Sequence, residues 1–197
     1  MVLDKMRSRS DFLVNGVASR LGGINPNSIT ILSLFIAILF AISFYYRFLI
    51  ISFFLLLATS YLDVLDGAVA RKFKKESMKG DFLDHLIDRY SDFIILLALT
   101  LSFFGNLYFG ILAIAGTFMS SYVGTQSQAV GMKRIYGGFP GRADRLIIVL
   151  IVIVIQIFTS TTLIYGYYIT SWALLFLGVA GFINSIYRAG LAYRSIA

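Results

Sequence analysis

Residues 63–92 read DVLDGAVARKFKKESMKGDFLDHLIDRYSD and hold most of the acidic side chains of the chain. This stretch joins two strongly apolar segments, so its aspartates fall at the ends of hydrophobic helices. A carboxylate inside the hydrocarbon of a bilayer costs about 2.5–3.5 kcal/mol on insertion scales. These acids must therefore face a polar cavity or a cation, and this requirement limits how the helices can be arranged.

The composition predicts an integral membrane protein. Hydrophobic residues make up 58% of the chain and charged residues only 14%, whereas a soluble domain carries about a quarter charged residues. The net charge of +7 would suggest nucleic acid in a soluble protein, but in a membrane protein the placement of the basic residues matters more. No nucleic-acid partner is expected. The absence of cysteine excludes disulfides and thiolate metal sites.

Apolar segments near the length of about 20 residues that a spanning helix needs predict an all-α protein with six transmembrane helices. The expected spans are 29–46, 48–70, 82–104, 107–128, 145–159 and 167–187. The fifth is short, so we expect it to start a turn earlier or to stand nearly upright. Asn27 or Ser28 is expected to cap the first helix. Residues 26–197 form the six-helix domain, and residues 1–25 are expected to form an amphipathic helix on the membrane surface, with an unstructured basic segment as the alternative.

Basic residues alternate between the predicted loops. They gather before the first span, between the second and third, between the fourth and fifth, and after the sixth, whereas the opposite loops hold only Arg47. Because cytoplasmic loops carry the excess of lysine and arginine, both termini and the acidic stretch are expected on the cytoplasmic side.

The spacing of four aspartates predicts a metal site. Asp63 and Asp66 are three residues apart, and Asp84 and Asp88 are four apart, so each pair shares one helix face. The short connecting loop makes the two helices antiparallel neighbours, and the four carboxylates can converge. Hard oxygen ligands favour Mg²⁺ or Mn²⁺, with Ca²⁺ possible, and two such ions suit phosphoryl chemistry.

Ion pairing is the alternative explanation of the acids. Arg71 and Arg89 could neutralise two of them, but two arginines cannot balance so many carboxylates. His85, the single histidine, is expected to pack or to hydrogen-bond locally rather than to catalyse.

The pattern D-x-x-D-G-x-x-A-R-x8-G-x3-D-x3-D, formed by residues 63–88, resembles the signature of the CDP-alcohol phosphatidyltransferase family. The resemblance implies a membrane enzyme of phospholipid biosynthesis. Such an enzyme transfers a phosphatidyl or archaetidyl group from a CDP-linked lipid to a polar alcohol and releases CMP. It also implies two divalent metal ions and a homodimer.

The resemblance further implies roles at the matching positions. Asp63 and Asp84 would bridge the two ions, Asp66 and Asp88 would each hold one, and Asp88 would also take the proton of the acceptor hydroxyl. The residues implied in CDP binding are Gly67, Arg71 and Ser77, with Asn27 and Thr30 at the entrance of the first span.

Basic residues near the fifth span suggest an acceptor that is itself a phosphate. They are Lys133, Arg134, Arg142 and Arg145. The segments 141–145 and 82–92 resemble the archaetidylinositol phosphate and phosphatidylinositol phosphate synthases, which implies myo-inositol 1-phosphate as the acceptor. Glycerol 3-phosphate or serine is the alternative, and membrane topology alone would also place basic residues here. The sequence leaves open whether the lipid is an ether isoprenoid or an ester diacylglycerol.

Two other classes of protein also place acids in a membrane. An intramembrane prenyltransferase uses aspartates and Mg²⁺ on a diphosphate, but it needs two separated aspartate motifs. A non-catalytic cation carrier explains the acids, but it does not explain Arg71 and the glycines at their fixed places.

Overall fold

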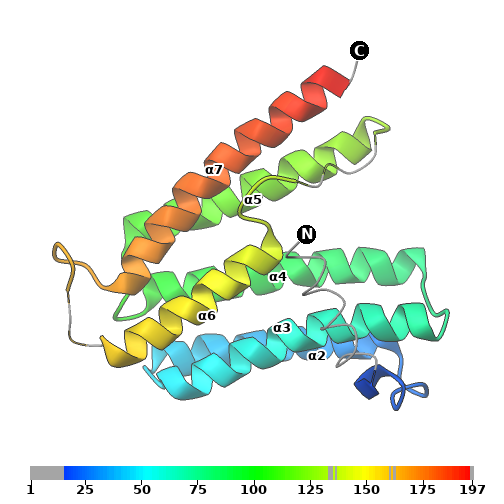
Figure 1. Cartoon of the computed structure of the whole chain (residues 1–197), viewed down its shortest axis with the longest axis horizontal. Helices are drawn as coiled ribbons and strands as arrows, with labels where there is room; N and C mark the ends of the chain where they lie inside the picture. Colours follow the sequence, from blue (N-terminus) through cyan, green and yellow to red (C-terminus); the bar gives the residue numbers. More distant parts are fainter. Residues whose placement is uncertain (1–15, 133–134, 136, 160, 162, 196–197) are drawn as a thin grey trace.

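The computed structural model describes residues 16–132, 135, 137–159, 161 and 163–195 (Figure 1). Within these residues, six long helices account for nearly all of the regular structure, and there is no strand. With the labels of Figure 1, they are α2 (Pro26–Tyr45), α3 (Leu49–Lys72), α4 (Met78–Leu101), α5 (Leu107–Ala129), α6 (Arg142–Phe158) and α7 (Ile169–Ser195). The predicted all-α class is confirmed.

The six helices overlap the six predicted spans, and four of them are candidate membrane spans by their length and composition. These four are α2, α3, α5 and α7. Helix α4 carries many charges in its first half, and α6 has 17 residues. Helix α6 begins at Arg142, about one turn before the predicted start. Most of the expected surface helix lies outside the described residues, although residues 16–18 are helical.

The first helix begins earlier than predicted. Asn25 is its N-cap and accepts a hydrogen bond from the backbone N–H of Asn27 at 3.1 Å. Pro26 is the first helical residue, a position that proline favours because its fixed φ suits the helix and its missing N–H is not needed there. The expectation that Asn27 or Ser28 caps the helix is therefore wrong. Asn27 lies within the first turn instead.

Helix α2 is the central support of the acidic half of the bundle. It packs against both α3 and α4, whereas no Cα atom of α3 lies within 8 Å of one in α4. The two helices run antiparallel, as expected (Figure 1), and their aspartates interact, but their backbones do not pack against each other. Their polar side chains need the space between them, and α2 holds both helices in place from one side.

Helices α5 and α7 form the closest pair in the structure. A Cβ atom on Gly181 would lie 2.7 Å from the backbone carbonyl carbon of Gly116, and one on Gly178 would lie 2.9 Å from the backbone nitrogen of Ala113. Small residues allow this backbone approach between membrane helices. The pair diverges from α3 and α4 toward the end that carries the C-terminus (Figure 1).

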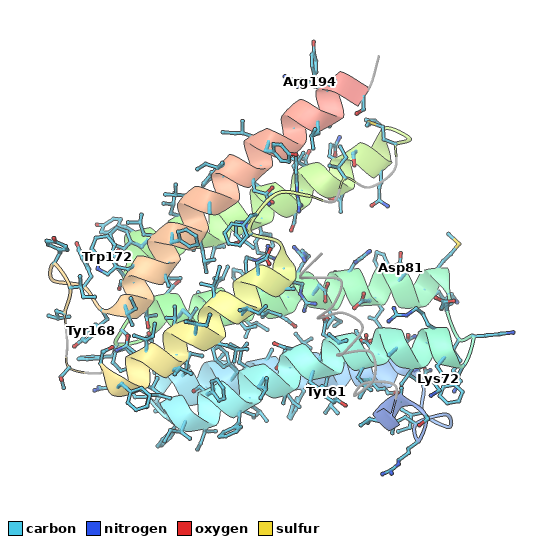
Figure 2. The ribbon with its side chains drawn as sticks, viewed as in Figure 1. Tyr61, Lys72, Asp81, Tyr168, Trp172 and Arg194 are labelled. Atoms are coloured by element: carbon cyan, nitrogen blue, oxygen red, sulfur yellow. The ribbon has the colours of Figure 1, made fainter. Side chains whose placement is uncertain are left out.

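The two ends of the bundle differ in character. Figure 2 places Lys72 and Asp81 at one end and Tyr168 and Trp172 at the other. The main apolar core contains Phe44, Phe104 and Leu174 and extends to the second end. A smaller apolar cluster surrounds Leu65 and Val69 and includes Ala18 from the segment before α2. The charged cluster therefore lies at the end that has the smaller apolar core.

Candidate active site

The structure brings the four predicted metal ligands into one cluster. Asp63 and Asp66 lie in α3, and Asp84 and Asp88 lie in α4. Asp66 interacts electrostatically with Asp63 and Asp84, and Asp88 interacts with the same two residues. Asp66 and Asp88 are 4% and 8% exposed. Because like charges repel strongly in such a site, the cluster needs positive charge to be stable.

The donor set fits a hard divalent cation. Single ligand atoms of Asp84, His85 and Asp88 lie within 4.8 Å of one another. The Oδ1 atom of Asp88 is buried, makes no hydrogen bond of regular geometry among the described residues, and lies 2.6 Å from the Arg142 guanidinium. Carboxylate oxygens are the ligands that Mg²⁺ and Mn²⁺ prefer. His85 lies on the more exposed side, with its Nε2 3.6 Å from Asp81.

Arg142 reaches into the aspartate cluster from the first turn of α6. Its guanidinium forms an ion pair with Asp63 and lies 2.6 Å from Asp88 and 3.6 Å from Asp92. The cation at the cluster is thus Arg142 rather than Arg71, which forms no ion pair with any described acid. Sequence reasoning missed this contact because it joins residues 79 positions apart.

A second network of charges lies beside the cluster and ties three helices together. Asp92 of α4 binds Arg145 of α6 at 2.5 Å and Arg89 at 3.4 Å. Arg89 also donates a hydrogen bond to Ser121 of α5. Asp92 and Arg145 are only 4% and 7% exposed. An arginine at the N-terminus of a helix is unfavourable, because its charge repels the positive end of the helix dipole. The aspartates of α4 offset this cost for Arg142 and Arg145 at the start of α6.

Asp92 received no role in the sequence analysis. Its spacing carries a weak signal, because it lies three residues after Arg89 and four after Asp88, on the same helix face. Its partner Arg145, however, comes from a distant helix. The start of α6 is fixed locally by Asp144, whose carboxylate accepts a hydrogen bond from the backbone N–H of Gly141 at 2.8 Å.

A cavity of about 220 Å³ opens beside the aspartates, between α2, α3, α4 and the loop that joins α3 to α4. Its lining includes Asp66 and Asp84 and all five residues implied in CDP binding, Asn27, Thr30, Gly67, Arg71 and Ser77. Thr30 donates a hydrogen bond to Asp66 at 2.6 Å. The cavity and the carboxylate cluster are therefore one continuous site.

Two glycines shape this cavity. A Cβ atom on Gly67 would lie 3.2 Å from the Arg71 guanidinium. A Cβ atom on Gly80 would lie 3.2 Å from the Ser77 hydroxyl and 3.3 Å from the Asn27 side chain. Ser77 also caps α4 by accepting the N–H of Gly80 at 3.1 Å. Both glycines thus keep polar side chains close to the cavity.

Lys75 belongs to the cavity but was absent from the predicted set. It lines the cavity and donates hydrogen bonds to the backbone carbonyls of Gly22 and Ile24, at 2.8 and 3.1 Å. It thereby holds the segment before α2 against the rim. Of the predicted acceptor residues, Arg142 and Arg145 lie at the aspartates, and Lys133 and Arg134 lie outside the described residues.

Comparison with known families and proteins gives consistent matches. A family model for CDP-alcohol phosphatidyltransferase matches residues 24–183. The archaetidylinositol phosphate synthase of Pyrococcus horikoshii is 36% identical over 129 residues, which are 66% of this chain and 69% of that protein. The enzyme of the same name from Methanothermobacter thermautotrophicus is 36% identical over 138 residues, which are 68% of this chain and 65% of that protein. The matches thus span about two thirds of these relatives.

Solved structures extend the likeness over most of the chain. The phosphatidylinositol phosphate synthase of Mycobacterium tuberculosis with CDP-DAG bound superposes with a TM-score of 0.78 at 25% identity, covering 91% of this chain and 93% of that one. The same enzyme in complex with manganese and citrate also gives a TM-score of 0.78 at 25% identity, covering 91% and 88%.

Asp92→Ala should destabilise the protein by about 3–5 kcal/mol, because it leaves the buried Arg145 and the half-buried Arg89 without their shared counterion. The measurement is thermal unfolding of the detergent-solubilised protein. Asp81→Ala on the same helix is the control, since the Asp81 side chain is 76% exposed, and it should change the free energy of unfolding by less than about 1 kcal/mol. Equal effects of the two changes would show that the buried network is not important for stability.

Proposed function

The chain belongs to the CDP-alcohol phosphatidyltransferase family, and on that premise we propose that it transfers the phosphatidyl or archaetidyl group of a CDP-linked lipid to myo-inositol 1-phosphate and releases CMP. The observation that carries the proposal is the continuity of the aspartate cluster with the cavity that holds the five CDP-binding candidates. Arg142 reaches this junction from α6. A charged donor and a charged acceptor can therefore meet at one point.

The CDP group of the donor binds in the cavity between α2, α3 and α4. Arg71 is the cation for its phosphates, and the absence of a side chain at Gly67 lets the nucleotide approach α3 closely. Asn27, Thr30 and Ser77 offer hydrogen bonds to the nucleotide. The lipid chains of the donor extend from the diphosphate into the bilayer.

Asp63, Asp66, Asp84 and Asp88 would hold two divalent ions, with Asp63 and Asp84 shared between them. When bound, these ions would neutralise the diphosphate and the charge that develops on departing CMP. A relative in this family binds manganese, and the all-oxygen donor set of this chain suits Mg²⁺ or Mn²⁺.

Transfer is a direct in-line displacement. The acceptor hydroxyl oxygen forms a bond to the phosphorus on the lipid side of the diphosphate. The bond from that phosphorus to the bridging oxygen breaks, and CMP leaves with the electron pair. Asp88 takes the proton of the hydroxyl, for which it must come within hydrogen-bond reach of the acceptor. No covalent enzyme intermediate is needed.

The acceptor phosphate binds to Arg142 and Arg145, with Lys133 and Arg134 contributing from the loop before α6. The contacts of Arg142 with Asp88 and Asp92 support this role, because they bring its guanidinium to the aspartate cluster. Two relatives at 36% identity are archaetidylinositol phosphate synthases, which supports inositol phosphate over the alternatives, glycerol 3-phosphate and serine.

The placement in the membrane follows from the same proposal. All six helices cross the bilayer, and the charges of α4 and the shortness of α6 are tolerated because both line the polar site. Both termini and the active site face the cytoplasm. The enzyme works as a homodimer, as the resemblance to the family implies.

An acceptor panel tests the proposed reaction. The purified enzyme is incubated with a CDP-lipid, Mg²⁺ or Mn²⁺ and one candidate alcohol, and CMP and the lipid product are measured by mass spectrometry. CMP should be released with inositol 1-phosphate and not without an acceptor, and EDTA should abolish the reaction. CMP release with glycerol 3-phosphate alone would move the assignment to that acceptor.

The same assay separates the other classes of protein. A prenyltransferase would consume a prenyl diphosphate and release no CMP from a CDP-lipid. A cation carrier would move Mg²⁺ or Mn²⁺ into sealed vesicles without any CMP release. Either result would refute the transferase assignment.

Asp88→Asn should lower kcat by about 10²–10⁴-fold, because the general base is removed, while the fold and donor binding are kept. Turnover is measured by CMP release, and binding by calorimetry with a CDP-lipid. Asp81→Asn is the comparison on the same helix: its side chain is 76% exposed at the cavity, so it should lower kcat far less than Asp88→Asn. Normal turnover by the Asp88 variant would remove its role as the base.

Arg142→Ala should raise the KM for inositol 1-phosphate by about 10- to 100-fold, the loss expected for one charged hydrogen bond to a phosphate. Arg145→Ala should act in the same direction. The KM for the CDP-lipid should change much less in both variants. A change confined to the donor KM would show that these arginines serve the nucleotide rather than the acceptor.

A further inference from the structure

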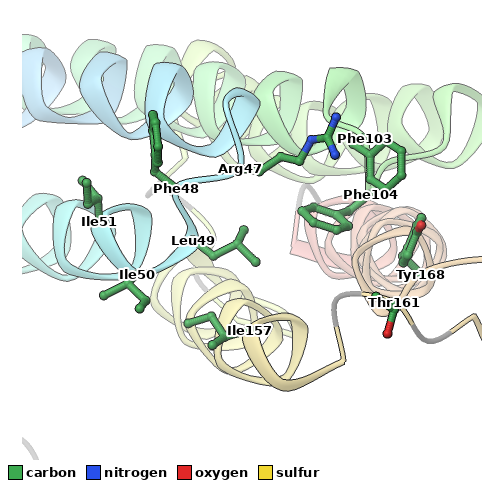
Figure 3. Close-up of a pocket in the computed structure, with 10 residues that line it drawn as sticks. All are labelled: Arg47, Phe48, Leu49, Ile50, Ile51, Phe103, Phe104, Ile157, Thr161 and Tyr168. Carbon is green, nitrogen blue, oxygen red and sulfur yellow. The ribbon is translucent and has the colours of Figure 1, made fainter.

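A large apolar cavity lies at the end of the bundle opposite the aspartates. It has a volume of about 850 Å³ and is formed by the α2–α3 turn, the start of α3, the turn after α4, the end of α6 and the segment that leads into α7 (Figure 3). Its lining is largely aliphatic and aromatic, with the hydroxyls of Thr161 and Tyr168 on one side. The volume falls in the range of small-molecule binding pockets. Nothing in the proposed reaction uses this cavity.

Arg47 is the one charged residue in the lining of this cavity. Its guanidinium lies over the ring of Phe103, with Cζ 4.2 Å from the ring centroid, a favourable cation–π arrangement. Figure 3 shows the side chain extending along the cavity toward Phe103. The backbone of Arg47 has a φ of 65°, in the left-handed region that non-glycine residues rarely adopt. The turn thus fixes an arginine in an unfavourable backbone conformation beside the cavity.

The part of the chain that the structure describes provides no anion for Arg47. No acidic residue occurs in 12–62, 93–143 or 145–197, which together contain every described residue that lines the cavity. Within the described part of the chain, Arg47 forms no ion pair. A neighbouring copy in the same orientation would present the same acid-free end of the bundle. None of the described residues of the chain is therefore a counterion for Arg47, which leaves this guanidinium available to an anion from another molecule.

We propose that this cavity binds one anionic phospholipid, with its phosphate on Arg47 and an acyl or isoprenoid chain along the apolar wall. The wall exposes large apolar side chains, with Phe48 at 58%, Ile50 at 63% and Phe103 at 53%, and hydrocarbon is the ligand that covers such a surface. A soluble anion would satisfy Arg47 and leave this wall in contact with water. The site lies at the membrane face away from the reaction and takes no part in transfer.

Trp172 is a built-in reporter for this site. It is the only tryptophan of the chain and lies one helical turn after Tyr168, which lines the cavity. The protein is reconstituted in nanodiscs of phosphatidylcholine, and its fluorescence is titrated with phosphatidylglycerol or phosphatidylcholine that carries dibrominated chains, which quench tryptophan on contact. Brominated phosphatidylglycerol should quench about fivefold more effectively at low mole fraction, the preference expected from one arginine.

Matched variants separate this site from general surface charge. Arg47→Gln should reduce the preference to about one, Arg47→Lys should keep part of it, and Arg194→Gln should keep all of it because Arg194 lies at the opposite end of α7 from Trp172 (Figure 2). Phe103→Leu retains the charge but removes the ring that orients it, and it should weaken the preference. CMP release by each variant reports whether it is folded.

Two outcomes would overturn the proposal. One is equal quenching of the wild-type protein by the two brominated lipids, which would show that no anionic lipid is selected near Trp172. The other is an equal loss of preference in the Arg47→Gln and Arg194→Gln variants, which would show that the net charge of the protein, rather than this cavity, attracts the lipid.

Discussion

The arrangement of this protein depends on the electrostatic cost of five buried or half-buried aspartates within an apolar helix bundle. A charge in such surroundings is stable only when it is paired or bound to a cation. Asp92 is compensated by arginines of α4 and α6, and Asp63 and Asp88 are compensated by Arg142. Asp66 is stabilised by the hydroxyl of Thr30. The same carboxylates that make the bundle costly to assemble supply the oxygen ligands that phosphoryl chemistry needs.

The helix packing provides the space for this chemistry. Direct packing of α3 on α4 would bury the carboxylates against one another, with no room for a cation or a diphosphate. Helix α2 contacts both helices and keeps their backbones apart. The cavity formed between the three helices continues into the aspartate cluster. The separation of α3 from α4 is therefore a requirement of the site, and α2 contributes both support and hydrogen-bonding groups such as Asn27 and Thr30.

The two ends of the bundle differ in polarity, and we relate each to a different contact with lipid. The aspartate cluster lies at one end of the bundle, whereas the opposite end combines the main apolar core with a cavity in whose described lining Arg47 is the only charged residue. A long bundle in a bilayer meets two interfaces, and each interface presents lipid headgroups. One end is built to act on a lipid diphosphate. The other offers a single cation where a headgroup phosphate would lie, which suits holding a lipid in place without altering it.

The sequence alone determined the helical class, the segments that form the six helices, and the four aspartates with the neighbours that line the cavity beside them, because those features depend on local hydrophobicity and on spacings within one helix. It could not determine that α2 separates α3 from α4, that Arg142 reaches Asp63, or that Asp92 joins three helices. Those contacts connect residues tens of positions apart, so they exist only once the chain has folded. Local physics is encoded in neighbouring residues, whereas the pairing of distant charges depends on how the helices pack in three dimensions.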